Sequence, residues 1–371
     1  MRITKRTSIL NIWIKSNEAL CASFTLILRH LLRTTLWCGS CFISPHFQRL
    51  PTSPPSLAFW PACYNSACSQ TLSQSNQALN KLVIFGVGLI GGSLALALKR
   101  KHMAPHIVGI GRPNDSLQTA LDMGVIDEVG ADIALALADA DMVLIATPVA
   151  QTARIFQTIA PHLNPNAIIT DVGSTKADVI RSAQQLLDKK NAQFVPGHPI
   201  AGAEKSGVTA ARADLFDNKN VVLTPTENTN LQALEAVRKL WESAGAHVCT
   251  MSASSHDGIF AAVSHLPHLL AFALVDEIAS RPNAAQLFDF AAGGFRDFTR
   301  IAGSSPEMWR DISLANRESL LSELSAYQDE LVKLKTLLES HDGAGLQALF
   351  ERASHARNDW VSAQASNKSK K

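Results

Sequence analysis

The sequence predicts an α/β domain built on a parallel sheet, followed by an all-α domain. Two observations carry this prediction: short apolar runs alternate with helical segments from residue 81 onward, and strand signals cease past residue 257. Such alternation is typical of doubly wound parallel sheets. We therefore divide the chain into an N-terminal extension, an α/β domain, a helical domain and a polar tail, over residues 1–80, 81–252, 253–363 and 364–371.

The extension differs in composition from the rest of the chain. It holds seven Lys/Arg, one acidic residue and five of the six cysteines, and its longest uncharged apolar run, 19–28, is too short to span a bilayer. Three interpretations stay open: sequence translated from a misassigned start, an organelle transit peptide, or a disordered extension.

The remaining residues carry 27 basic and 31 acidic side chains. This slightly negative net charge does not favour binding to nucleic acid, and no membrane partner is expected. The single cysteine among the remaining residues, Cys249, fits a reducing compartment. We expect a cytoplasmic protein, or an organellar one if residues 1–80 are a transit peptide.

A glycine-rich turn follows the first apolar run, 81–86, and precedes a helical run over 93–101 and a second strand over 106–111. In G-x-G-x-x-G the first glycine permits a tight turn, the second admits a pyrophosphate, and the third allows close helix–strand packing. The pattern favours a Rossmann-type dinucleotide site over a purely structural turn. Its residues are Gly86, Gly88, Leu89, Ile90 and Gly91.

The end of the second strand predicts the cofactor. NAD sites usually place an acidic residue there to bind the ribose, whereas here Gly111 is followed by Arg112. A 2′-phosphate favours a permanent, planar cation. We predict NADP rather than NAD; the alternative is that Arg112 is a solvated loop residue.

The alternation continues with strands expected at 141–146, 167–171, 194–196 and 221–223, and helices at 149–163 and 175–187. Ligands of such sheets lie at the carboxyl ends of the strands. The sequence therefore predicts one cleft, surrounded by Thr147, Pro148 and residues 173–176 and 197–199.

Three polar side chains of these segments are candidates for chemistry. His198 lies in a Gly/Pro-rich loop and can accept a proton near neutral pH, unless it merely caps the loop. Ser174 could orient a substrate hydroxyl, and Lys176 could hold an anion. The alternative is that Ser174 or Thr175 caps the helix that follows.

The second domain offers two pairs spaced three apart, which share a helical face. Arg300 suits a bidentate carboxylate contact, or forms a surface ion pair with Asp297. His265 and His268 have a spacing that could suggest zinc, but no further ligand stands at a recognisable distance, so no metal is expected.

Leucines farther on recur at steps of four and three, which predicts a heptad stripe or an ordinary core helix. Gly343 and Gly345 are expected to end this helix. The stripe consists of Leu320, Leu324, Tyr327, Leu331, Leu334 and Leu338.

From Lys81 to about Trp360 the chain resembles prephenate dehydrogenase and the related arogenate and cyclohexadienyl dehydrogenases. The resemblance implies NAD(P)-dependent oxidative decarboxylation of prephenate, or of arogenate, in tyrosine biosynthesis, and a helical domain that pairs two subunits into a homodimer. It rests on several motifs in order, at 87–93, 171–176, 197–202, Glu204 and Gly207, 264–268 and 295–302.

The resemblance also implies roles for single residues. His198 would accept the hydroxyl proton, Ser174 would position that hydroxyl, and Arg300 would bind a substrate carboxylate. The remaining substrate-binding residues would be His268 at the side-chain end, Asp297 beside a cation, and Lys176, Glu204 and His265 around the cleft. Thr147 and Pro148 would join the glycine turn and Arg112 at the cofactor.

The sequence pattern is also compatible with two other functions. A β-hydroxyacid dehydrogenase of the 6-phosphogluconate type also joins a Rossmann domain to a helical one, but would want a catalytic lysine that no motif supplies in the helical domain. A non-catalytic NADP-binding regulator would bind cofactor without turning over substrate.

Overall fold

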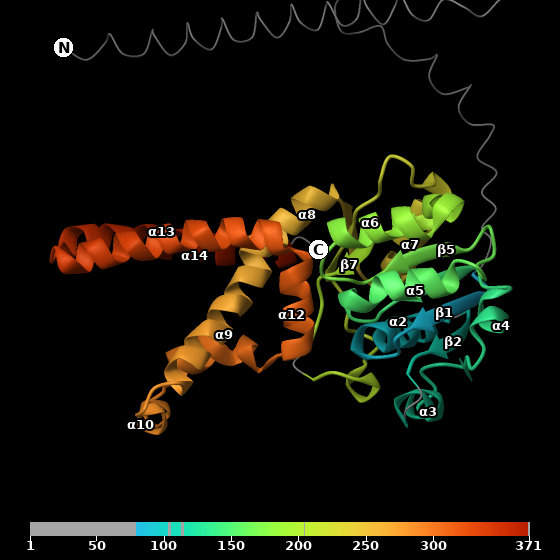
Figure 1. Cartoon of the computed structure of the whole chain (residues 1–371), viewed down its shortest axis with the longest axis horizontal. Coiled ribbons are helices and arrows are strands. Elements are labelled where there is room, and N and C mark those ends of the chain that lie inside the picture. The colour runs from blue at the N-terminus through green and yellow to red at the C-terminus, as the bar shows by residue number, and fades with distance from the viewer. Residues whose placement is uncertain (1–78, 103–104, 113–114, 204, 370–371) are drawn as a thin grey trace, which may run out of the picture. The chain divides into compact units, whose positions relative to one another are not determined.

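The computed structural model describes residues 79–102, 105–112, 115–203 and 205–369 (Figure 1). The predictions made for the extension up to residue 78 and for Glu204 lie outside these residues.

Six parallel strands form the main sheet, in the order β3-β2-β1-β4-β5-β6, which confirms the predicted parallel α/β domain. The central strands are buried along nearly their whole length, as strands covered on both faces should be. The strands are β1 (Lys81–Phe85), β2 (His106–Ile110), β3 (Glu128–Val129), β4 (Met142–Ile145), β5 (Ile168–Asp171) and β6 (Phe194–Val195).

Alternate side chains of β1 enter two separate cores. Leu82 and Ile84 pack with helices α2, α3 and α7 on one face, and Val83 and Phe85 pack with α4, α5 and α6 on the other. The sheet is therefore doubly wound. The helices are α2 (Leu89–Arg100), α3 (Asp115–Asp122), α4 (Ile133–Leu137), α5 (Thr152–Ile159), α6 (Ala177–Leu186) and α7 (Leu231–Ser243), with short 3-10 turns η1 (Val149–Gln151), η2 (Asp188–Gln193) and η3 (Val208–Ala210).

A second, three-stranded sheet follows β6. β8 (Asn220–Leu223) pairs antiparallel with β7 (Gly197–Pro199) and parallel with β9 (His247–Thr250). The predicted loop around His198 is thus an edge strand. Its Gly-His-Pro sequence suggested a loop, but an edge strand tolerates proline because the missing N–H would not join the ladder.

Helices fill the described residues from Ala253 onward, which confirms the predicted all-α domain. They are α8 (Ala253–Phe260), the π-turn η4 (Ala261–His265), α9 (Leu266–Ala279), α10 (Ala284–Asp289), α11 (Gly293–Thr299), the 3-10 turn η5 (Arg300–Gly303), α12 (Pro306–Ala315), α13 (Arg317–Glu339) and α14 (Gly343–Ser369).

The continuous stretch Ala253–Ala279 is notably apolar. Its mean hydropathy reaches 1.8, so by length and composition alone it could cross a membrane, although core helices of soluble proteins pass the same test. Only 28% of that apolar window is buried within the chain. The stretch therefore has apolar surface that the described residues do not cover.

The heptad stripe lies wholly on α13, beside α14 (Figure 1). The prediction that Gly343 and Gly345 end this helix is wrong. α13 ends at Glu339, the chain turns at His341 with φ 55°, and Gly343 begins α14. The Asp342 carboxylate accepts from Gly345 N at 2.8 Å, as in a helix cap, and α14 continues through the predicted polar tail as far as Ser369.

Candidate active site

The glycine turn between β1 and α2 has the shape of a phosphate site. A Cβ on Gly86 (φ +93°) would lie 2.7 Å from the Ala146 carbonyl oxygen, and one on Gly91 would lie 2.5 Å from the Gly86 oxygen. A Cβ on Gly88 would meet nothing within 4 Å, and Gly88 begins α2 without a side-chain cap. The start of α2 thus has space beside Gly88 and no capping side chain on its first-turn N–H groups, which fits a dinucleotide diphosphate.

The other predicted cofactor residues lie at the ends of β2 and β4. Thr147 is half-buried, and its methyl group is among the atoms that a Cβ on Gly86 would strike. Its hydroxyl is buried and has no hydrogen-bond partner among the described residues. Pro148 and Arg112 are exposed. Thr147 therefore lies against the glycine turn, and Arg112 is accessible two residues past the end of β2.

Lys176 is fully buried and forms an ion pair with Asp171 at the end of β5. Its Nζ donates to the Asp171 carboxylate at 2.5 Å and to the Gly197 carbonyl at 2.7 Å. Asp171 also accepts from the backbone N–H groups of Gly173 and Gly197. The structure thus contradicts the prediction that Lys176 holds a substrate anion: its charge fixes the strand that carries His198.

The N-terminus of α6 is capped from the other domain. Asp257 of α8 accepts from the backbone N–H groups of Lys176 and Ala177, both at 2.9 Å. The cap predicted from Ser174 or Thr175 is therefore replaced by a carboxylate 81 residues away. Ser174 is half-buried in the loop between β5 and α6.

His198 contacts a second histidine that the sequence did not single out. Its Nδ1 lies 2.8 Å from Nε2 of His256, and Nδ1 of His256 lies 2.8 Å from Oδ1 of Asp257. The Phe260 ring packs against both imidazoles, with centroid distances of 4.8 and 4.5 Å. His198, His256 and Asp257 thus form a series of hydrogen bonds that connects β7 with α8.

Burial and hydrogen bonding together set the charge states of His198 and Asp257. Burial lowers the pKa of His198 well below its usual value, and the nearby His256, Lys176 and His265 add to the effect. Burial alone would raise the pKa of Asp257, but hydrogen bonds from His256 and from two backbone N–H groups outweigh it and lower that pKa. A neutral His198 is therefore available as a base below pH 6.5.

His265 is buried close to the hydrogen-bonded series of His198, His256 and Asp257. It is 1% exposed, Asn316 Nδ2 donates to its Nδ1 at 3.1 Å, and Asn316 also donates to the Asp257 carbonyl at 2.7 Å. Burial lowers the pKa of His265 to about 4. The predicted substrate contact of His265 is not supported, because the ring is enclosed and bound to Asn316.

His268 lies one turn farther along α9. Its Nδ1 donates to the Ser264 carbonyl at 2.9 Å, and its ring stacks on Trp309 of α12 with centroids 3.6 Å apart. Burial lowers the pKa of His268, and the charge of Arg300 lowers it further. The charge of Arg300 therefore acts on the His268 ring. Arg300 and Asp297 are both exposed.

Sequence reasoning missed His256, Asp257, Asn316 and Trp309 as parts of the site. The adjacent His-Asp pair before an apolar helix was the available signal for the first two. Neither Asn316 nor Trp309 stands in a recognisable motif. Trp309 of α12 reaches the site by stacking on His268, and Asn316, between α12 and α13, reaches it through hydrogen bonds to His265 and Asp257. Within the described part of the chain, no three His, Cys, Asp or Glu side chains are grouped as a metal site requires.

Comparisons with known proteins identify the family of the chain. Residues 94–250 match the family described as prephenate dehydrogenase, nucleotide-binding domain, and residues 252–352 match prephenate dehydrogenase, dimerization domain. The chain is 41% identical over 285 residues to prephenate dehydrogenase of Bacillus subtilis, covering 76% of each chain. It is 37% identical to cyclohexadienyl dehydrogenase of Zymomonas mobilis, covering 74% of this chain and 94% of that protein.

Solved structures agree with these matches. Prephenate dehydrogenase of Aquifex aeolicus, in complex with hydroxyphenyl propionate and NAD+, is 38% identical with a TM-score of 0.72, covering 76% of this chain and 99% of that one. Arogenate dehydrogenase of Synechocystis is 32% identical with a TM-score of 0.65 and the same coverage.

Proposed function

The chain belongs to the prephenate dehydrogenase family and has its NAD(P)-dependent prephenate or cyclohexadienyl dehydrogenase activity; we propose that His198 is the base of that reaction. The observation that supports this role is the position of His198 on β7, where its Nδ1 lies 2.8 Å from Nε2 of His256 and its Nε2 has no hydrogen-bond partner among the described residues. The family match removes the 6-phosphogluconate-type and non-catalytic alternatives.

The reaction assigns a task to each group. In prephenate, a hydride leaves the ring carbon that bears the hydroxyl and is accepted by the nicotinamide, which is the chemistry the cofactor supplies. His198 accepts the hydroxyl proton as that hydride departs and returns it to the phenolate oxygen. The ring carboxylate leaves as CO₂, and its bonding electron pair enters the ring, which becomes aromatic. The product is 4-hydroxyphenylpyruvate.

The substrate-binding groups are proposed on charge. Prephenate carries two carboxylates, which favour a cation as partner. Arg300 is exposed, and its charge acts on His268. Ser174, beside the buried Asp171–Lys176 pair, positions the ring hydroxyl. Asp297 lies three residues before Arg300 and limits which anions approach it.

For the cofactor we propose NADP. The relative from Aquifex aeolicus holds NAD+, so the preference of this chain depends on its own residues. The support is Arg112, exposed two residues past β2, where an acidic residue would repel a 2′-phosphate. A charge-assisted hydrogen bond of this kind is worth about 1.5–3 kcal/mol.

Steady-state kinetics with prephenate and with arogenate, each with NAD and NADP, test the function and the cofactor together. We expect CO₂ release with at least one substrate and a lower KM for NADP than for NAD. Arg112→Gln should raise the KM for NADP about 10- to 100-fold and leave that for NAD nearly unchanged. The control is Arg154→Gln, which removes an exposed arginine from α5. A wild-type preference for NAD, or equal losses with both cofactors, would contradict NADP.

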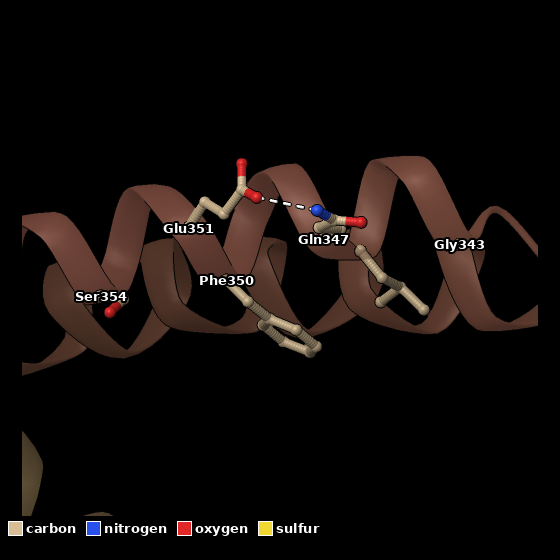
Figure 2. A pocket seen from close by; sticks show the side chains of 6 residues that line it. Gly343, Gln347, Phe350, Glu351 and Ser354 are labelled. Atoms are coloured by element: carbon tan, nitrogen blue, oxygen red, sulfur yellow. Dashed lines mark hydrogen bonds between the residues drawn. The ribbon is translucent and has the colours of Figure 1, made fainter.

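We also propose that two copies pair through the helical domain, which matches the family's dimerization domain. The support is uncovered apolar surface: Leu331 and Leu338 on α13 are 46% and 62% exposed, and Phe350 on α14 is 57% exposed. Figure 2 shows Phe350 at a pocket whose lining residues all belong to α14. Large exposed apolar side chains on two helices are consistent with a surface that pairs with another subunit.

Sedimentation of the full chain tests the dimer. We expect twice the mass of the chain at micromolar concentration and a shift toward the monomer on Leu331→Glu. Lys333→Glu, on the opposite side of the same helix, is the matched control and should leave the mass unchanged. A wild-type monomer at these concentrations would reject the proposal.

A further inference from the structure

A series of hydrogen bonds extends from His198 through His256 to Asp257. It joins β7 of the nucleotide-binding domain to α8 of the helical domain, and its middle member, His256, is completely buried. We infer that His256 and Asp257 are positioning residues, which fix the tautomer of His198 and stabilise the cation formed when His198 takes the substrate proton. This inference rests on the proposed role of His198 as the base.

The carboxylate of Asp257 determines which nitrogens of His256 and His198 carry protons. Asp257 is ionised, so its Oδ1 can only accept, and Nδ1 of His256 must carry the proton in their 2.8 Å contact. Burial lowers the pKa of His256, so this ring is neutral and its Nε2 holds a lone pair. His198 then donates from Nδ1 into that lone pair at 2.8 Å. Nε2 of His198 is left as the acceptor for the substrate hydroxyl.

The same contacts act when the proton arrives. Protonated His198 keeps its Nδ1–H donated to His256, and a hydrogen bond from a charged donor is stronger than one from a neutral donor. The negative charge of Asp257 polarises His256 and so strengthens this acceptor. The buried setting would otherwise oppose a cation, because desolvation lowers the pKa of His198.

Asp257 is itself held in place. Two backbone N–H groups at the start of α6 donate to its two carboxylate oxygens, and Asn316, between α12 and α13, donates to its backbone carbonyl. The position of His198 is therefore tied to the packing of α8 on α6. The other charged or titratable groups that face His198 are Lys176 before α6, paired with Asp171 of β5, and His265 of η4.

Two substitutions at His256 distinguish a positioning role of its hydrogen bond from a role in filling space. His256→Leu removes the acceptor, and we expect kcat to fall about 10- to 100-fold with KM nearly unchanged. The acid limb of the kcat/KM profile should move to lower pH, because the His198 cation loses its partner. His256→Gln offers an amide oxygen to His198 and should recover part of kcat and of the pH shift. The control is His247→Gln on β9, away from the site.

Thermal unfolding of each variant accompanies the kinetics. A His256→Leu protein with wild-type kcat and pH profile would overturn the inference, and so would equal losses of kcat in the Leu and Gln variants without a pH shift. Activity retained in His198→Asn would instead reject His198 as the base, so the two failures are distinguishable.

Histidine ¹⁵N NMR of the wild-type enzyme tests the tautomers without any substitution. At neutral pH we expect protons on Nδ1 of both His198 and His256, and none on Nε2 of His198. A proton on Nε2 of His198 would overturn the inference even if the variants fail to fold.

Discussion

Replacing His198 by Asn should lower kcat about 10²- to 10⁴-fold, the usual contribution of a positioned general base. KM should change little, because the proton moves only in the transition state. Since burial lowers the pKa of His198, the wild-type acid limb of kcat/KM should lie below pH 6.5. That limb should be absent from the residual activity of the variant.

The matched control is His162→Asn, which changes an exposed histidine remote from the site. It should retain wild-type kcat and pH dependence. Unaltered turnover in His198→Asn would remove this imidazole from the mechanism.

The second large effect is on stability. Lys176→Met should lower the free energy of unfolding by about 3–5 kcal/mol, because it leaves the carboxylate of Asp171, which is 1% exposed, without its cation. It also removes the hydrogen bond to the Gly197 carbonyl, next to His198. Urea unfolding monitored by fluorescence measures the loss.

The double variant Asp171→Asn with Lys176→Met is the informative comparison. Removing both charges of a buried pair is often far less costly than removing one. We expect the double variant to recover part of the stability lost in Lys176→Met. A single variant within about 1 kcal/mol of wild type would show that the pair does not stabilise the fold.

The sequence was sufficient for the features that depend on local pattern. Buried parallel strands are apolar runs, and the glycine turn has a fixed spacing, so the main sheet and the turn at Gly86, Gly88 and Gly91 were predictable. The long helix α13 was predictable for the same reason. Each of these features is written within a few neighbouring residues.

The features that the sequence did not reveal depend on contacts between distant segments. Lys176 looked like an anion ligand because nothing local shows that its ammonium reaches the Gly197 carbonyl. The helix cap at α6 comes from Asp257, and the partner of His198 is His256, 58 residues away. Such pairings arise only when β7 and α8 are packed together.

The most direct test of His198 as the base is a crystal structure of the enzyme with its cofactor and a hydroxyphenyl ligand. We expect the phenolic oxygen within about 2.6–3.2 Å of Nε2 of His198, and the ring carbon that bears it about 3–3.5 Å from the nicotinamide. A ring bound with its oxygen away from His198, while still facing the nicotinamide, would contradict the proposed role.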